Sequence, residues 1–280
     1  MRPAMRLVTW NVNSLKARLP RVEAWIGSHA PDVLLLQETK CTDDAFPAEA
    51  FAQLGYESAH HGDGRWNGVA IVSRVGLADV RIGFRERSSP ISDECRILAA
   101  NCGGVRFCSV YVPNGRVVDS EFYAAKLEWL ANLRHELDTT CLPTEAVAVG
   151  GDFNVAPEDR DVWDITQFAG LTHVTRAERD ALRAVMDFGL EDVVRRLHPD
   201  DAGPFSWWDY RGGAFHKGKG MRIDLVLVSA PLAARVTAAF VDREARKGQG
   251  SELQPSDHAP VVVDVMSEGR RGQAVAEGEG

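Results

Sequence analysis

Short apolar runs that each end on a polar side chain are the feature of this sequence that most constrains its fold. The three clearest are residues 7–10, which run into Asn11, residues 32–37, which run into Glu38, and residues 146–149, which lead through two glycines to Asp152. Runs of this length, rich in valine, leucine and isoleucine, are typical of buried strands. Four more runs of the same kind are residues 68–73, residues 107–110 before Tyr111, residues 221–228 and residues 259–265.

Helical patterns separate several of these strands. Apolar residues keep near-helical spacing at Leu15, Leu19, Val22 and Ile26, and again at Phe122, Leu130, Leu133 and Leu137. A third helix is predicted from Thr175, because Thr175 and Glu178 fit a capping box, and Gly189 is expected to close it. Strands that alternate with helices predict an α/β fold with sheets inside and helices outside.

Composition limits the function classes. The chain has 280 residues, of which 45% are hydrophobic and 26% charged, as in ordinary soluble globular proteins. The formal net charge of −8 argues against a protein that coats DNA nonspecifically through a broad basic surface. It does not exclude a nuclease, because a bound divalent cation reverses the field of an acidic site.

The sequence also carries expectations on location and organisation. No signal peptide is recognised, and the most apolar stretch, residues 225–241, is interrupted by Pro231 and Arg235, so no membrane span is expected. Five cysteines without a Cys-x-x-Cys pair favour reduced thiols in the cytoplasm over a zinc site or disulfides. We expect one catalytic domain over residues 1–266, a disordered Gly/Glu-rich tail over residues 267–280, and a monomer, because no heptad pattern is present.

The polar residues at the strand ends are the candidates for chemistry. Glu38 is either a metal ligand or a charge in solvent at the end of a strand. Asp152 and Asn154 lie two residues apart, so on an extended chain they share one face. Glycine, aspartate and asparagine also dominate turns, so residues 151–154, taken alone, are better explained as a turn.

Two further acids are more informative. Asp257 and His258 are adjacent just before a predicted strand, so regular β geometry directs them to opposite faces, one toward a metal and the other toward a substrate. Asp224 stands in an apolar run, where an unpaired carboxylate is costly. Its partner is predicted to be a histidine, with an ion pair to Arg222 as the alternative.

Six motifs carry a resemblance to a known family. They are Thr9-Trp10-Asn11-Val12-Asn13, Leu36-Gln37-Glu38-Thr39-Lys40, Tyr111-Val112-Pro113-Asn114-Gly115, Gly151-Asp152-Phe153-Asn154, Met221-Arg222-Ile223-Asp224 and Ser256-Asp257-His258-Ala259-Pro260. In this order and spacing the chain resembles the exodeoxyribonuclease III family, within the endonuclease/exonuclease/phosphatase superfamily. The resemblance covers the chain up to the tail. It implies a four-layer α/β sandwich, in which two mixed β-sheets pack face to face with helices outside.

The resemblance also implies site roles. Glu38 is the principal Mg²⁺ ligand, supported by Asn11 and Asp257, and Mn²⁺ is a possible substitute. Asp224 orients His258, whereas Asp152 and Asn154 lie beside the attacking water. Tyr111 and Asn114 position the phosphate. Either Asp152 or His258 could be the general base, and we favour Asp152, with His258 as a stabiliser of the transition state.

The substrate expectation rests on an aromatic cluster at residues 205–210. Core packing is the alternative explanation, and it is expected for Phe205 or Trp208. By resemblance, Trp207, Met221 and Ile223 wall a pocket for an extruded abasic sugar, although Met221 stands where some relatives have a bulkier residue. Candidates for backbone-phosphate contacts are Lys217, Lys219, Arg211, Arg65 and Arg116. The predicted partner is double-stranded DNA with abasic sites or 3′ ends, cleaved 5′ to the abasic site or trimmed from the 3′ end.

Two other functions fit parts of the pattern. A superfamily phosphatase or phosphodiesterase that acts on lipid or inositol phosphates would share Glu38, Asp152 and His258 but would lack the cluster around Trp207. A catalytically silent binding module would have lost the acids or the histidine, and here all are present. The nuclease is therefore the leading prediction.

Overall fold

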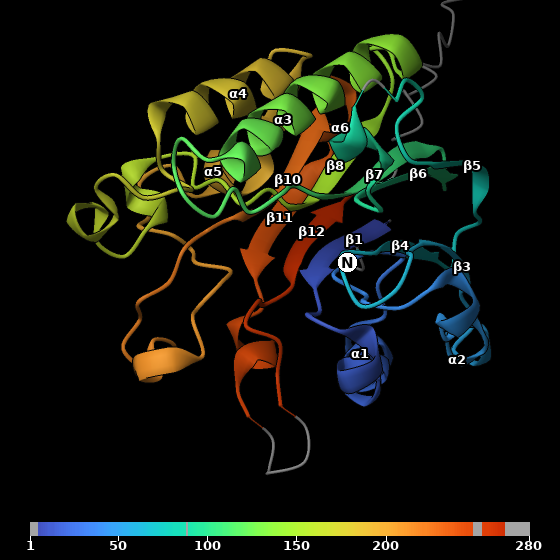
Figure 1. Cartoon of the computed structure of the whole chain (residues 1–280). Helices are drawn as coiled ribbons and strands as arrows, with labels where there is room; N and C mark the ends of the chain where they lie inside the picture. Colours follow the sequence, from blue (N-terminus) through green and yellow to red (C-terminus); the bar gives the residue numbers. More distant parts are fainter. Residues whose placement is uncertain (1–4, 88, 249–253, 267–280) are drawn as a thin grey trace, which may run out of the picture.

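Two six-stranded sheets form the centre of the molecule (Figure 1). The computed structural model describes residues 5–87, 89–248 and 254–266, so the predicted tail over residues 267–280 lies outside the described residues. The first sheet has the order β11-β12-β1-β2-β4-β3, with bounds β1 Met5–Asn11, β2 Val33–Gln37, β3 Glu57–His61, β4 Val69–Ser73, β11 Val236–Val241 and β12 Val261–Val265. The second has the order β5-β6-β7-β8-β10-β9, with bounds β5 Ala78–Ile82, β6 Ile97–Cys102, β7 Val105–Tyr111, β8 Val147–Asp152, β9 Leu190–Asp192 and β10 Asp224–Ser229.

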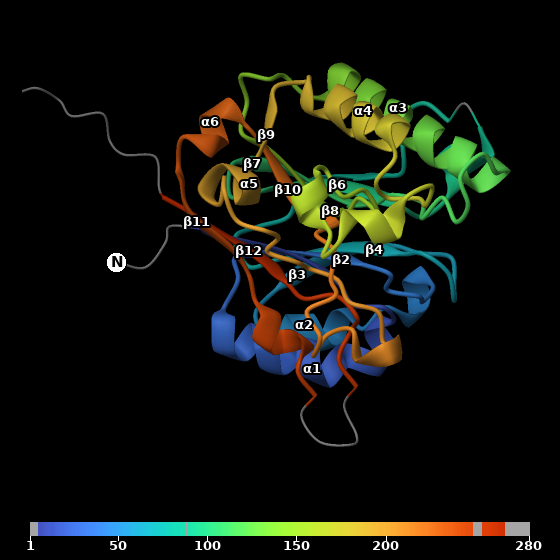
Figure 2. The same cartoon turned by 90° about the vertical axis from the view of Figure 1, so that its left-hand side faces the viewer.

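Helices cover the outer faces of both sheets, which gives the four layers seen edge-on in Figure 2. The α-helices are α1 Leu15–His29 and α2 Ala48–Gln53 on the first sheet, α3 Glu121–Thr140 and α4 Arg176–Met186 on the second, and the short α5 Val193–Leu197 and α6 Ala230–Ala233. Short 3₁₀ turns are η1 Asp43–Ala45, η2 Pro90–Asp93, η3 Asp159–Asp161, η4 Ile165–Phe168, η5 Arg211–Gly213 and η6 Arg243–Arg246. The predicted fold class, a four-layer α/β sandwich with mixed sheets, is confirmed.

The apolar runs are continuous because the strands are buried on both faces. In β2, Leu35 faces the other sheet and packs in a core cluster with Phe107 and Val226. Its neighbour Leu34 faces outward and packs in a second cluster with Val22 of α1. Successive side chains of the strand therefore point alternately into two different apolar cores, and neither face of the strand is polar.

Several predicted boundaries differ from the structure. The strand expected over residues 221–228 begins at Asp224, and the strand expected over residues 259–265 begins at Val261. Strands β3, β5, β6, β9 and β11 were not predicted. In β3 and β5 no residue is fully buried, because both strands lie at sheet edges, so they lack the apolar runs used to recognise the others.

The helices show two further differences. Phe122 was assigned to the apolar face of its helix, but it is 41% exposed and lies under the guanidinium of Arg116. The capping box of Thr175 and Glu178 is confirmed, whereas the helix ends at Met186, before Gly189. All five cysteines are free, and all except the half-buried Cys41 are buried. No helix among the described residues is both long and apolar enough to cross a bilayer.

Candidate active site

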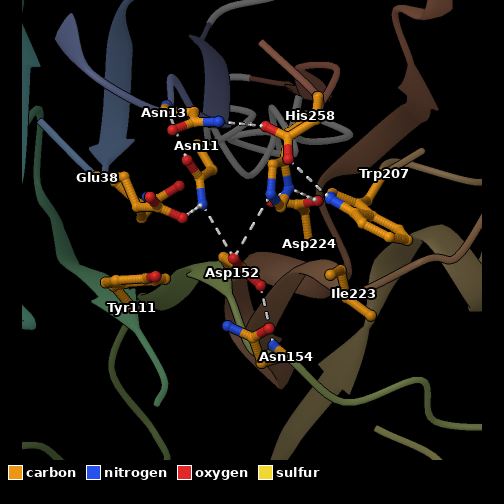
Figure 3. Close-up of polar contacts among 12 residues, drawn as sticks. Asn11, Asn13, Glu38, Tyr111, Asp152, Asn154, Trp207, Ile223, Asp224 and His258 are labelled. Carbon is orange, nitrogen blue, oxygen red and sulfur yellow. Dashed lines mark hydrogen bonds and ion pairs between the residues drawn. The ribbon is translucent and has the colours of Figure 1, made fainter. Parts of the chain in front are cut away.

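The strand register brings the predicted polar residues to one end of the sandwich (Figure 3). Strands β1 and β2 are parallel neighbours, so Asn11 and Glu38 emerge from the same edge of the first sheet. In the second sheet β7 and β8 are parallel, with Tyr111 opposite Asp152. Strand β10 runs antiparallel to β8 and starts with Asp224 opposite Asp152. Asn11 and Asp152, which are 141 positions apart in the chain, thus meet because the two sheets pack face to face.

Glu38, Asp152 and His258 form the candidate metal centre. Each offers one ligand atom, and these atoms all lie within 4.8 Å of one another. Two carboxylates suit Mg²⁺, a hard ion that prefers oxygen ligands and keeps several waters. The donor set therefore fits a divalent cation beside Glu38, the predicted principal ligand, although it includes neither Asn11 nor Asp257.

Glu38 is held as an anion. Burial raises the pKa of this carboxyl, but Lys40 and a hydrogen bond from Asn11 lower it by more, so the net pKa is below its usual value. Nζ of Lys40 is 2.7 Å from Oε2 of Glu38. The backbone of Glu38 has a φ of 52°, in the left-handed region that few non-glycine residues adopt. Such strained conformations cluster at functional sites.

Asn11 links the two carboxylates as a donor. Its Nδ2 donates to Oε1 of Glu38 at 2.9 Å and to Oδ2 of Asp152 at 3.0 Å. Its Oδ1 accepts a hydrogen bond from the backbone N–H of Asn13. The amide nitrogen, rather than the oxygen that a cation needs, therefore faces the candidate metal centre, and the role of Asn11 as a ligand stays a prediction.

His258 lies between two carboxylates. Its Nδ1 is 2.8 Å from Oδ2 of Asp224, and its Nε2 is 3.8 Å from Oδ2 of Asp152. Burial lowers the pKa of the imidazole, but Asp224 and Asp152 raise it more, to about 10. Burial, with Asp224 and Glu38 nearby, raises the pKa of Asp152 to about 7 although the charge of His258 opposes this shift. These raised pKa values favour a cationic imidazole beside a carboxyl that titrates near neutral pH.

Asp224 pairs with the histidine, as predicted, and not with Arg222. Its Oδ2 also accepts a hydrogen bond from Oγ of Ser206 at 2.6 Å. Arg222 instead contacts Asp161 and Asp192, with nitrogen–oxygen distances of 2.6 Å to each. The alternative ion pair between Asp224 and Arg222 is therefore wrong.

Asp257 is hydrogen-bonded to two neighbouring side chains, Asn13 and Trp207. Its two oxygens accept hydrogen bonds from Nδ2 of Asn13 at 2.9 Å and from Nε1 of Trp207 at 3.1 Å. Burial raises the pKa of Asp257, but His258 and these two donors lower it by more, so the net pKa is below its usual value. Asp257 is outside the three-residue cluster, so its role as a metal ligand stays a prediction.

Two asparagines lie on the other side of Asp152. The backbone N–H of Asn154 donates to Oδ1 of Asp152 at 2.9 Å, and Nδ2 of Asn114 donates to Oδ1 of Asn154 at 3.1 Å. Asn154 has a φ of 51°, so the predicted turn and the predicted site residue are the same feature. Tyr111 completes this side, and burial together with Glu38 places its pKa well above 10.

Two adjoining cavities lie at this end of the molecule. The smaller, of about 210 Å³, is lined by the three residues of the candidate metal centre together with others that include Tyr111, Asp257 and Ile223. The larger, of about 480 Å³, is lined by apolar side chains such as Phe168 and Leu171. The two share a wall, formed by Asn114, His173, Trp207 and Met221. Trp207, Met221 and Ile223 thus lie where a pocket beside the metal centre was predicted.

Comparison with known proteins decides the family. The family model described as "Endonuclease/Exonuclease/phosphatase family" matches residues 8–258. This chain belongs to that family. Exodeoxyribonuclease III of Haemophilus influenzae is 33% identical to it, over 93% of this chain and 99% of the relative.

Solved structures of the family agree with the fold. An AP endonuclease from Archaeoglobus fulgidus superposes with a TM-score of 0.88 at 35% identity, covering 93% of this chain and 99% of that one. The 3′-5′ exonuclease NExo from Neisseria meningitidis superposes with a TM-score of 0.86 at 38% identity, covering 94% and 100%. Within the endonuclease/exonuclease/phosphatase family, this chain is a nuclease.

The predicted phosphate contacts of this nuclease fall in different places. Arg116 lines the larger cavity, with its guanidinium 3.8 Å from the ring centroid of Phe122. Lys217 is exposed and outside the lining residues of both cavities, whereas Lys219 lines the larger one and lies over Trp163. The contact assigned to Lys217 stays a prediction, and Lys219 is better placed to meet a ligand in the cavity.

Some residues of the site were missed. Lys40 and Asn13 lie inside the quoted motifs, and their places next to Glu38 and Asn11 were a usable signal. Ser206, which donates to Asp224, had no signal beyond its place in the aromatic cluster. His173, in the wall between the two cavities, had none at all.

Proposed function

We propose that this nuclease cleaves double-stranded DNA 5′ to abasic sites and trims 3′ ends, in a reaction that depends on Mg²⁺ or, in its place, Mn²⁺. The observation that carries the proposal is the shared wall of the two cavities. It places the apolar side chains of Trp207 and Met221 next to the carboxylates that would hold the cation. A sugar without its base has an apolar face that suits such a wall.

Glu38 would hold the cation as its principal ligand, with Asn11 and Asp257 as the additional ligands that the family resemblance implies. When bound, the cation would neutralise charge that develops on the phosphoryl group and on the leaving 3′ oxygen. Lys40 would keep Glu38 ionised in its buried position.

Asp152 and His258 divide the proton chemistry. The pKa of Asp152 is about 7, so near neutral pH this carboxylate can accept the proton of an attacking water. The pKa of His258 is about 10, so the imidazole is a cation that donates a hydrogen bond to a phosphate oxygen and cannot act as a base. Asp224 stabilises that cation through Nδ1. These properties support Asp152 as the general base.

Three neutral groups orient the phosphate and the water. Tyr111 keeps its proton, because its pKa is well above 10, and so it can donate to a phosphate oxygen. Asn154 and Asn114 are hydrogen-bonded to each other, which fixes their amides beside Asp152. Arg116, and Lys217 or Lys219, would contact phosphates of the flanking strand.

A second candidate activity is removal of phosphate groups from the 3′ ends of DNA, without cleavage at internal abasic sites. It is favoured by the identity of 38% to NExo of Neisseria, one structure of which is described as a 3′ phosphatase bound to product DNA hairpin. The abasic endonuclease from Archaeoglobus is 35% identical. The same cluster of Glu38, Asp152 and His258 would serve both reactions.

Two substrates separate these functions. A duplex with one internal abasic site and a hairpin with a 3′-phosphate are each incubated with Mg²⁺, with Mn²⁺ and with a chelator. The proposal expects a nick 5′ to the abasic site, lost with the chelator. Phosphate release from the hairpin without a nick would favour the second candidate. Activity on neither, with hydrolysis of an inositol or lipid phosphate, would favour the superfamily phosphatase.

The proposal also covers the setting of the enzyme. Residues 1–266 form one catalytic domain that acts as a monomer. Four of the five free thiols, at Cys95, Cys102, Cys108 and Cys141, are buried, which suits a protein of the reducing cytoplasm. Size-exclusion chromatography with light scattering tests the monomer.

A further inference from the structure

A buried ion pair lies directly behind the loops of the active site. Nζ of Lys126, in α3, is 2.5 Å from Oε1 of Glu178, in α4. Both side chains are 0% exposed. Two charges lose their hydration here, and hydrophobic residues could join the helices without that cost. The pair therefore needs an explanation beyond the packing of α3 on α4.

The contacts of Lys126 point toward the site. Besides the bond to Glu178, its Nζ donates to the backbone carbonyl of Asn154 at 2.7 Å and to that of Asn114 at 3.3 Å. These are the two asparagines whose side chains are bonded to each other next to Asp152. One ammonium group therefore ties together the loop after β7 and the loop after β8.

Glu178 is fixed in turn by its own partners. Its carboxylate accepts hydrogen bonds from Oγ1 of Thr172 at 2.6 Å and from the backbone N–H of His173 at 2.9 Å. The other oxygen accepts from the backbone and hydroxyl of Thr175, which closes the capping box of α4. With this many donors the carboxylate is anchored, so it can set the position of Lys126.

The loops need this support. Asn154 has a φ of 51°, and a non-glycine residue persists in such a conformation only where its surroundings hold it. Gly115 also has a positive φ, of 83°, and a Cβ there would lie 2.9 Å from Cδ of Lys126. Glycine thus lets the loop close over the lysine side chain, and the closed loop presents the carbonyl of Asn114 to Nζ.

We propose that Lys126, held by Glu178, is a positioning residue for phosphodiester hydrolysis. It fixes Asn154 and Asn114 in the conformation in which their amides, together with Asp152, face the reacting phosphate. The inference rests on the proposed roles of Asp152 and Asn154. Neither Lys126 nor Glu178 reaches the substrate, so both act through the geometry of the loops.

The test removes both charges together. In Lys126→Met/Glu178→Gln no buried charge is left without a partner, which favours folding. We expect kcat to fall about 10- to 100-fold, because a displacement of about 1 Å at a reacting centre costs on the order of 100-fold. KM for the duplex should change less than about threefold, since the DNA contacts remain. If the double variant does not fold, Lys126→Gln, which leaves Glu178 hydrogen-bonded to Thr172 and Thr175, should lower kcat by at least about threefold.

The matched control removes an ion pair at the far end of β1. Arg6 pairs with Asp264 through two nitrogen–oxygen contacts of 2.8 Å. Arg6→Met/Asp264→Asn should keep the kcat of the wild type. An equal fall in kcat in this control would mean that loss of stability, not loop geometry, slows the enzyme.

A combination with Asn154→Ala separates positioning from simple stability. Because the pair of Lys126 and Glu178 acts through Asn154, adding its double substitution to Asn154→Ala should lower kcat little further. The same addition should lower the thermal unfolding midpoint by as much as it does in the wild type. A normal kcat in the pair variant, or losses that multiply in the triple variant, overturn the positioning role. A normal kcat in Asn154→Ala alone contradicts the proposed function as well, and so distinguishes the two failures.

Discussion

Nδ1 of His258 lies 2.8 Å from Oδ2 of Asp224, and both side chains are buried at the end of the sandwich where the strands deliver their polar residues. The contact joins the start of β10 in one sheet to the loop before β12 in the other. It sets the charge of the imidazole and leaves Nε2 directed toward Asp152.

Loss of either member of this pair should disable the other. We expect His258→Ala to lower kcat by about 100-fold or more, within the range for the loss of a preorganised donor to charge that develops in the transition state. Asp224→Ala should lower it by at least about 10-fold, and the double variant should be no slower than His258→Ala alone. Steady-state kinetics of the four enzymes gives the answer, and independent losses that multiply would show that Asp224 does not serve His258.

The same pair predicts a pH dependence of stability. The pKa of His258 is about 10 in the folded state against an ordinary value of 6.5, so the folded protein holds this proton more tightly than the unfolded chain. The resulting stabilisation is fully present below about pH 6.5 and is lost as the pH rises through about 10. Thermal unfolding without metal, measured from pH 6 to pH 10, should show a falling midpoint.

His258→Gln is the control for that measurement. It removes the titrating group but keeps a polar side chain, so the fall between about pH 6.5 and 10 should flatten. An equally steep fall in the variant would assign the dependence to other groups.

The metal assignment is tested at Glu38. Glu38→Gln keeps the size of the side chain but removes the anionic oxygen, so we expect the Mg²⁺ concentration for half-maximal cleavage to rise at least about 10-fold. Glu57→Gln, at an exposed position of the edge strand β3, is the matched control and should behave as the wild type. Normal cleavage by Glu38→Gln at limiting Mg²⁺ would show that Glu38 is not a principal ligand.

Trp207 separates DNA repair from other phosphate-ester chemistry. Trp207→Ala should reduce cleavage at abasic sites and narrow the preference over intact duplex, because the apolar wall is lost. Hydrolysis of a small generic phosphodiester should stay nearly unchanged, since the metal cluster is untouched. Trp207→Phe keeps an aromatic wall but lacks the hydrogen bond to Asp257, so it should retain most of the preference. Full preference in Trp207→Ala would leave Trp207 as a packing residue.

The fold class was predictable from the sequence, and so were the polar residues that gather at the candidate site. Runs that are apolar at every position, as in residues 33–36, indicate strands covered on both faces. In such a run a terminal Glu38 or Asp152 has little structural purpose, so the polar ends of strands mark the site. Their order along the chain then supplied the family.

The partners of the charged residues were decided by the tertiary structure. Arg222 and Asp224 lie two residues apart, yet one contacts Asp161 and Asp192 and the other contacts His258. Sequence spacing gives the face on which a side chain lies, but the pairing depends on which loop covers that face.

Lys126 shows the same limit most plainly. Its place in a helix of mixed polarity indicates a lysine in solvent, and the structure buries it fully against Glu178 and the carbonyl of Asn154. Periodicity is a property of one helix, whereas these contacts depend on how α4 and the loop after β8 pack on α3. The sequence determined which residues could do the chemistry, and the packing of distant segments decided which of them are held in place to do it, because burial and pairing of charges arise only where those segments meet.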